Sequence, residues 1–186
     1  RILLRLSPCF LVALMQIFAM CELLGRWPSV ITDVLIILLA KPAGGFRPVG
    51  IFPTVVRVWF RARSRRIRAW EQSHERPYFF AGSGRGADTA AWLQAAFMEN
   101  AALSRTGAAA SLIDLAKAFE RVSHIGLRDA AMRWDYSLWA LKLSIAAYRL
   151  DRRISINGIL SRVVVACRGI TVGSTFATTQ LRLLLL

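Results

Sequence analysis

The most informative part of this sequence is Ala109-Ala110-Ser111-Leu112-Ile113-Asp114-Leu115-Ala116-Lys117-Ala118-Phe119-Glu120-Arg121-Val122-Ser123-His124. Residues 109–115 predict a buried strand, and a turn or a helix is expected from Ala116 onward. Asp114 lies at the end of that strand, where a carboxylate is costly unless it is paired or bound to a metal ion. The alternative is a helix N-cap, which Asp fills well. Spacing alone leaves both interpretations open, and His124 is interpreted as a helix-start histidine rather than a base.

The chain is both apolar and strongly basic. Of its 186 residues, 55% are hydrophobic and 19% are charged, which excludes intrinsic disorder. Lys and Arg number 25 against 11 Asp and Glu, so the net charge is +14, and nearly all of the basic residues are Arg. Because Arg binds phosphate through two parallel hydrogen bonds, a polyanion is the expected partner, nucleic acid first and an anionic membrane second. The 3 cysteines form no CxxC pair, so neither a disulfide framework nor a structural zinc site is expected.

The N-terminal part predicts a helix, a strand and a turn. Residues 10–24 are nearly all apolar and end before Gly25, which predicts a buried core helix rather than a membrane span. Residues 29–40 end in a β-branched run that predicts a strand buried on both faces, or the end of a buried helix. Residues 41–51 contain two Gly and two Pro and predict a hairpin tip that carries one Lys and one Arg. The chain starts at Arg and stops inside a leucine run, so we expect it to be an internal piece of a longer protein.

Residues 52–72 predict an amphipathic helix. Its apolar residues fall within an arc of about 100°, and they are Phe52, Val56, Trp59, Phe60, Ile67 and Trp70. Four arginines on roughly the opposite side form what we call the arginine stripe: Arg57, Arg61, Arg65 and Arg68. The stripe is either a solvated face or a surface that follows a phosphate backbone. Arg63 falls inside the apolar arc, and the pattern does not explain it.

The remaining segments predict further helices and one hairpin. Residues 77–89 form an irregular Gly-rich loop around Arg85, and a helix is expected over 89–103. Helices are also expected over 125–133 and 137–150. Asn157-Gly158 predicts a hairpin turn between strands at 154–156 and 162–165. The chain is then expected to turn through Gly173 and Ser174 and to begin a last helix near Thr175.

Four segments, in order, resemble motifs of reverse transcriptases of the non-LTR retrotransposon and group II intron type. Residues 111–124 resemble the palm motif LDLxKAFDxVxH, and residues 39–49 resemble the fingers motif PKP…RPI. Residues 80–89 resemble GFRxGRST.DA, and residues 169–175 resemble GVPQGSPLSP. The four segments follow the family order, and the resemblance extends across roughly residues 27–186.

This resemblance implies an α+β fold. The chain would form the fingers and a partial palm of a right-hand polymerase, with an antiparallel palm sheet backed by helices and incomplete at the C-terminus. The implied divisions are an N-terminal apolar helical segment over 1–26, a fingers-like region over 27–108 and a partial palm over 109–186.

The resemblance also implies a set of site residues for template-directed DNA synthesis by two-metal nucleotidyl transfer. Asp114 is implied as the catalytic carboxylate and, with the carbonyl of Leu115, as a ligand of Mg²⁺. Lys41 and Arg47 are implied to grip the incoming deoxynucleoside triphosphate, and Phe119 to exclude a 2′-hydroxyl. Contacts with the RNA or DNA template-primer are implied for the arginine stripe and for Arg85, Gly173 and Ser174.

The sequence departs from the family pattern in several places. Glu120 replaces the second Asp of AFD, which is not a metal ligand, and Val172 replaces the Gln of PQG. The sequence contains no Asp-Asp pair, and the family's YADD hairpin supplies the other catalytic carboxylates. We therefore expect this piece to be inactive on its own.

Two alternatives remain. One is a non-catalytic basic nucleic-acid-binding remnant of a retroelement. The other is a membrane-associated protein that uses residues 10–24 and the arginine-rich helix. A retroelement product is expected inside the cell, in the nucleus or the cytoplasm, with no membrane partner.

Overall fold

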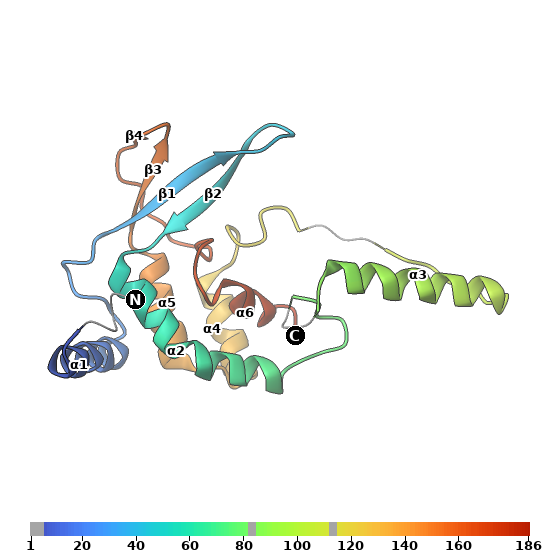
Figure 1. The fold of residues 1–186 in the computed structure, drawn as a ribbon, viewed down its shortest axis with the longest axis horizontal. Helices are drawn as coiled ribbons and strands as arrows, with labels where there is room; N and C mark the ends of the chain where they lie inside the picture. Colours follow the sequence, from blue (N-terminus) through green and yellow to red (C-terminus); the bar gives the residue numbers. More distant parts are fainter. Residues whose placement is uncertain (1–5, 82–84, 112–114) are drawn as a thin grey trace. The chain divides into compact units, whose positions relative to one another are not determined.

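The computed structural model describes residues 6–81, 85–111 and 115–186. Within these residues the chain forms six helices and four strands, which confirms an α+β composition (Figure 1). The elements in chain order are α1 (Pro8–Leu24), β1 (Asp33–Ala40), β2 (Phe46–Ile51), α2 (Thr54–Ser73), α3 (Ala87–Leu103), α4 (His124–Arg133), α5 (Leu138–Tyr148), β3 (Asp151–Ile156), β4 (Ile159–Leu160) and α6 (Ala177–Arg182).

The chain divides into two compact units. The larger unit consists of Arg1–Ala69 and Lys117–Leu186, and it holds the sheet, α1, most of α2, α4, α5 and α6. The smaller unit, Trp70–Ala116, holds the end of α2 and the helix α3 that residues 89–103 predicted. The predicted boundaries after residues 26 and 108 stay predictions.

The sheet of the larger unit is mixed, with the strand order β2-β1-β3-β4. β1 pairs antiparallel with β2, and β3 pairs antiparallel with β4, as hairpins require. The central pair, β1 and β3, runs parallel, so the predicted antiparallel sheet is wrong at this pair. A hairpin turn fixes direction only within its own hairpin, and the two hairpins come from distant parts of the chain. An ion pair of 2.8 Å between Arg153 and Asp33 accompanies the parallel pairing.

Both predicted hairpins are present, but the turn predicted over 41–51 is wrong in extent, because residues 46–51 form β2, and the second hairpin is short. The amide of Lys41 donates a 3.0 Å hydrogen bond to the carbonyl of Gly45, which closes the tip between β1 and β2. Asn157 and Gly158 have φ values of 49° and 82°, which suit the two central positions of a tight hairpin turn. The returning strand β4 spans only Ile159–Leu160. The strand predicted over 162–165 is wrong in extent, because Val164 forms only a single bridge to Arg152.

Two strand predictions fail on burial. β1 forms as predicted, but Leu39 near its end is 51% exposed, so burial on both faces is wrong. The outer end of the β1–β2 hairpin extends past the helices that cover its base, so it has little to pack against (Figure 1). Ala109–Ser111 and Leu115 are exposed and lie outside any strand, and 112–114 are not among the described residues. A buried strand over 109–115 is therefore wrong where the chain is described, since these small side chains bury little apolar area.

The apolar face of α2 forms the core of the larger unit, as the sequence predicts. Phe60 packs edge-on against Phe176 with ring centroids 5.0 Å apart, and Trp59 lies 5.8 Å from the same ring. Phe52 contacts Phe60 at 5.5 Å and Tyr148 at 6.3 Å. Edge-to-face pairs of this kind add about 0.5–1.5 kcal/mol each beyond the area that they bury. The core therefore joins α2 to α5 and to the chain just before α6.

α1 is a helix as predicted, but it is not a buried core helix. Ser7 caps its N-terminus by accepting a 3.3 Å hydrogen bond from the amide of Phe10, and Gly25 ends it in the left-handed conformation. Only Phe18 and Cys21 are buried, because the helix packs along one stripe against α5 and has most of its circumference exposed. Among the described residues, no helix is both long and apolar enough to cross a membrane.

Candidate functional site

Residues 169–174, which we call the glycine loop, are seated on strand β2. The amide of Gly50 donates a 2.7 Å hydrogen bond to the carbonyl of Val172. Gly173 has a φ of 110°, and a Cβ atom there would collide with the carbonyl oxygen of Gly50. The main chain of the loop therefore lies so close to the main chain of β2 that no side chain fits between them at position 173. This contact ties the predicted template-side loop to the hairpin that carries Lys41 and Arg47.

The other end of the glycine loop holds the turn that contains Phe119. The amide of Gly169 donates a 2.8 Å hydrogen bond to the carbonyl of Val122. The amide of Ile170 donates a second bond, also 2.8 Å, to the carbonyl of Phe119. Phe119 itself is half-buried in the turn over residues 116–121. The loop therefore bridges two segments that the motifs treat separately.

The side chain of His124 holds the first residue of the glycine loop by a hydrogen bond. His124 is the first residue of α4, as predicted, and its Nε2 lies 2.9 Å from the carbonyl oxygen of Gly169. Arg149 donates to Nδ1 at 3.3 Å, so the network requires a neutral ring that carries its proton on Nε2. Burial lowers the pKa of His124, and the nearby charges of Arg149 and Arg152 lower it further. The hydrogen bond to Gly169 acts in the opposite direction on this pKa.

The glycine loop, the turn and the sheet enclose a cavity of about 230 Å³, which we call the glycine-loop cleft. β1 and β2 contribute Ile36, Leu38, Pro48 and Gly50 to its lining. Glu120 from the turn and Arg152 from β3 add one charge of each sign. Because pockets for whole small ligands typically measure roughly 300–1,000 Å³, this cleft suits a part of a ligand.

Arg152 is a cleft residue that sequence analysis missed. Its Nη2 donates to the carbonyl of Tyr148 at 3.1 Å and to Oγ1 of Thr171 at 3.0 Å. Its Nε is buried and makes no hydrogen bond within the described chain, a costly state for a charged donor. Burial also lowers the pKa of this guanidinium. The sequence held one signal for this residue: a charged Arg lies among the strand residues that precede Asn157-Gly158.

The predicted triphosphate-binding residues lie on the β1–β2 hairpin. Lys41 at the tip and Arg47 on β2 are both exposed. Pro48 and Gly50 line the glycine-loop cleft, whereas Arg47, which pairs with Leu39, alternates with them along β2 and so faces the other side of the sheet. The structure thus brings the hairpin, the Phe119 turn and the glycine loop together around one cavity.

Ser174 has a structural role at the end of the glycine loop. Its hydroxyl accepts a 3.2 Å hydrogen bond from the amide of Phe176 and lies 2.8 Å from the hydroxyl of Tyr148. That Tyr148 hydroxyl also lies 2.6 Å from Oε1 of Gln180. Ser174 is buried, and its predicted contact with nucleic acid stays a prediction.

The basic residues fall into two groups by unit. All four members of the arginine stripe are exposed on α2, in the larger unit. Arg85 belongs to the smaller unit, where it forms a 3.5 Å ion pair with Glu75 and donates to the carbonyl of Arg76 at 3.3 Å. Glu75 therefore partly neutralises the positive charge of Arg85.

The predicted metal ligands are described only in part. Asp114 lies outside the described residues, and Leu115 beside it is exposed. Among the residues that the structure describes, no group of three His, Cys, Asp or Glu side chains could hold a metal ion. The Mg²⁺ site therefore rests on the sequence motif.

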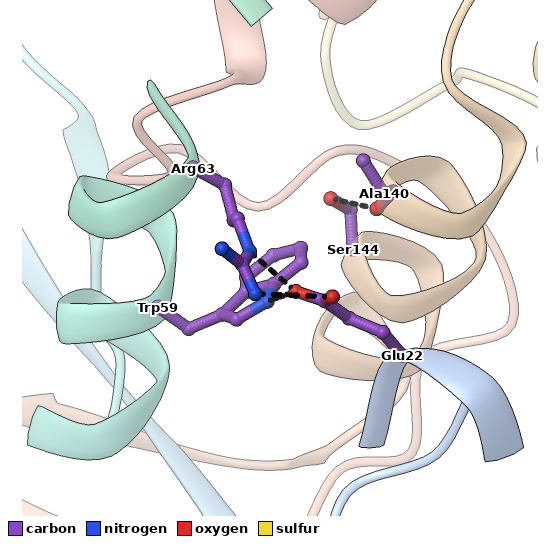
Figure 2. Close-up of polar contacts among 5 residues, drawn as sticks. All are labelled: Glu22, Trp59, Arg63, Ala140 and Ser144. Carbon is purple, nitrogen blue, oxygen red and sulfur yellow. Dashed lines mark hydrogen bonds and ion pairs between the residues drawn. The ribbon is translucent and has the colours of Figure 1, made fainter. Parts of the chain in front are cut away.

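A cluster around Glu22 explains Arg63, the charge inside the apolar arc of α2. Arg63 donates to the two oxygens of Glu22 at 2.6 Å and 3.2 Å, and Nε1 of Trp59 donates to Oε1 at 2.6 Å (Figure 2). The carboxylate comes from α1, so this contact joins α1 to α2. Sequence analysis missed it because the partners are 41 residues apart and follow no shared motif.

Comparison with known proteins assigns no family. No protein-family model matches the chain, and no curated protein matches it either. The resemblance to reverse transcriptases therefore depends on the four motif segments themselves.

Proposed function

We propose that this chain forms the fingers and the adjoining part of the palm of an RNA-directed DNA polymerase. On this proposal the glycine-loop cleft receives part of an incoming deoxynucleoside triphosphate beside a template-primer. One observation carries the proposal: main-chain hydrogen bonds join β2, the glycine loop and the Phe119 turn around one cavity. Three of the four motif segments meet there, although they are far apart in the sequence.

The charges near the cleft suit a triphosphate. Lys41 and Arg47 do not line the cleft themselves, but they are exposed on the hairpin that contributes to its lining, where a phosphate tail that extends out of the cleft could meet them. An Arg fork and a Lys point charge are the usual donors for such a group. Phe119 is half-buried in the turn whose main chain bonds to the glycine loop, and on this proposal its ring would pack against the sugar. Mg²⁺ held by Asp114 and the Leu115 carbonyl would supply the charge that stabilises the leaving pyrophosphate.

Binding of a fluorescent deoxyadenosine triphosphate to the chain in Mg²⁺ tests this proposal. Arg47→Gln and Lys41→Gln should each weaken binding about tenfold, since a charge-assisted hydrogen bond is worth about 1.5–3 kcal/mol before solvent screening. Arg133→Gln, at an exposed position at the end of α4, removes the same charge away from the β1–β2 hairpin and should have no effect. Equal affinities in all three variants would contradict the proposal.

A second candidate function is that of a non-catalytic nucleic-acid-binding remnant. The exposed arginine stripe favours it, because phosphate contacts need no catalytic carboxylate. Asp114→Asn separates the two functions: on the polymerase proposal it removes the Mg²⁺ dependence of triphosphate binding and leaves duplex binding unchanged. A chain that binds duplex but no triphosphate, with or without Mg²⁺, would be the remnant.

A further inference from the structure

A second cavity lies on α2, on the side that faces α1 and α5. Its volume is about 610 Å³, and we call it the Arg–Trp cleft. Three arginines line it (Arg63, Arg65 and Arg66) together with Trp139 and Glu22. Its volume falls within the roughly 300–1,000 Å³ that is typical of pockets for small ligands.

Glu22 fixes one wall of the Arg–Trp cleft. Its carboxylate accepts from the guanidinium of Arg63 at 2.6 Å and 3.2 Å and from the indole of Trp59 at 2.6 Å (Figure 2). The side chains of Glu22 and Arg63 are only 16% and 23% exposed. Arg63 is therefore held in place by a carboxylate whose main hydrogen bonds are already made.

Trp139 contacts two of the three guanidinium groups of the cleft. The Cζ atoms of Arg63 and Arg66 lie 5.8 Å and 5.5 Å from its ring centroid. A guanidinium that stacks by its face keeps its N–H edge free for a phosphate. Arg66 is thus oriented by the indole and still able to donate.

The cleft carries an excess of positive charge. Three arginines against one glutamate leave a net charge of +2. In the described part of the chain, Arg65 and Arg66 form no ion pair with an acidic residue. An anion bound there would meet two uncompensated guanidinium groups, one of them already oriented.

We propose that the Arg–Trp cleft binds one nucleotide of a single-stranded nucleic acid, with its phosphate on Arg65 and Arg66. The base would stack on the side of the Arg66 guanidinium that faces away from Trp139, and such a planar surface accepts any base. The backbone of a single strand is flexible enough to place one phosphate inside the cleft, whereas a duplex is too stiff to do so. Because Arg65 also belongs to the arginine stripe, a strand that leaves a duplex on the stripe can enter the cleft directly. The choice of nucleic acid rests on the proposed function, but Arg66, Trp139 and Glu22 lie outside the glycine-loop cleft.

The test compares an oligo-dT strand with a DNA duplex by fluorescence anisotropy over a range of salt concentrations. Arg66→Gln should weaken oligo-dT binding about tenfold and flatten the slope of log K against log salt by about 0.7, the value for one phosphate of a single strand. Duplex binding should change less than about twofold, since a duplex does not enter the cleft. Arg66→Lys should keep the slope but lose affinity, because a Lys ammonium lacks the planar stack.

Trp139→Leu provides an independent reading of the same cleft. It should weaken oligo-dT binding about fivefold without changing the salt slope, since it removes stacking and no charge. Arg133→Gln is the matched control for charge and should leave both probes unaffected. Melting temperatures of all variants identify those that fail to fold, and Arg66, as an exposed residue, should tolerate substitution.

Two outcomes of these experiments would overturn the proposal. Equal losses for strand and duplex on Arg66→Gln would make the cleft an ordinary part of the stripe. Displacement of oligo-dT by free thymidine monophosphate at equal nucleotide concentration would make the ligand a free nucleotide. The proposed polymerase function fails separately, if Arg47→Gln leaves triphosphate binding unchanged while the strand preference of the Arg–Trp cleft persists.

Discussion

The amide nitrogen of Gly50, on β2, donates a 2.7 Å hydrogen bond to the carbonyl oxygen of Val172 in the glycine loop. Directly beside it, Gly173 leaves no room for a Cβ atom against the carbonyl of Gly50. This close contact holds the glycine loop against the strand that helps to line the glycine-loop cleft. The integrity of the cleft should therefore depend on the absence of a side chain at position 173.

Gly173→Ala should unseat the glycine loop. Its φ of 110° disfavours any side chain, and the new Cβ atom would also collide with Gly50. Gly45→Ala is the matched control, since Gly45 has a φ of 80° but nothing within 4 Å of a Cβ atom. Conformational strain alone costs about 1–2 kcal/mol, so Gly173→Ala should destabilise the chain by clearly more than Gly45→Ala. Equal melting temperatures in the two variants would show that the contact with Gly50 is not important.

The arginine stripe should make duplex binding depend steeply on salt. Each phosphate that is neutralised contributes a slope of about −0.9 in log K against log salt. Replacing all four residues of the arginine stripe with Gln should flatten this slope by several units. The four residues are Arg57, Arg61, Arg65 and Arg68. Fluorescence anisotropy with a primer-template duplex measures the slope.

The control for the stripe removes the same charge elsewhere on the larger unit. Its four exposed positions are Arg26, Arg128, Arg133 and Arg162. This variant should keep most of the slope. If both quadruple variants lose the same amount, net charge and not the stripe attracts the duplex.

Stability should decrease with acid because of His124. Its pKa in the folded chain is lowered, mainly by burial, so the unfolded chain takes up a proton at a pH where the folded chain does not. The contribution is fully present above the ordinary His value of about 6.5 and is lost as the pH falls through the lower, folded value. The slope can reach about 1.4 kcal/mol per pH unit.

Urea denaturation at several pH values between about 7.5 and 5.5, a range centred near the ordinary pKa of His, measures this slope. His124→Gln keeps a donor for the carbonyl of Gly169 but cannot titrate, so it should flatten the pH dependence in this range. A variant as pH-sensitive as the original chain would exclude His124 as the cause.

Glu22→Gln should destabilise the junction of α1 and α2. The change leaves Arg63 largely buried without its counter-charge, and hydrogen bonds to charged groups are worth about 1.5–3 kcal/mol. Asp129→Asn breaks a pair with Arg128 in which both side chains are at least half exposed, and should cost less than about 1 kcal/mol. Chemical denaturation of both variants tests the contrast, and comparable costs would contradict it.

Local patterns predicted much of the fold. The amphipathic period of residues 52–72 marks both the buried aromatic face of α2 and its exposed arginine stripe. Asn157-Gly158 marks a hairpin because few other residue pairs accept two positive φ values. These signals work because each one depends on neighbours within a few residues.

Contacts between distant residues could not be predicted in the same way. The apolar run of α1 indicated burial, but burial depends on how many elements surround a helix, and α1 has few. The parallel pairing of Asp33 with Asp151 depends on how two hairpins pack. For the site, the motifs identified the three segments that meet, whereas Arg152 and the Glu22–Arg63 pair became visible only in three dimensions.

Photo-crosslinking tests the proposed polymerase function most directly. An azido-deoxyadenosine triphosphate is irradiated with the chain in Mg²⁺, and the labelled peptides are identified by mass spectrometry. We expect labels on the hairpin over residues 41–51 and on the glycine loop over residues 169–174, with excess unlabelled deoxynucleoside triphosphate suppressing both. Labels spread over the arginine stripe, or labels that unlabelled triphosphate does not suppress, would contradict the proposal that these segments form a nucleotide-binding cleft.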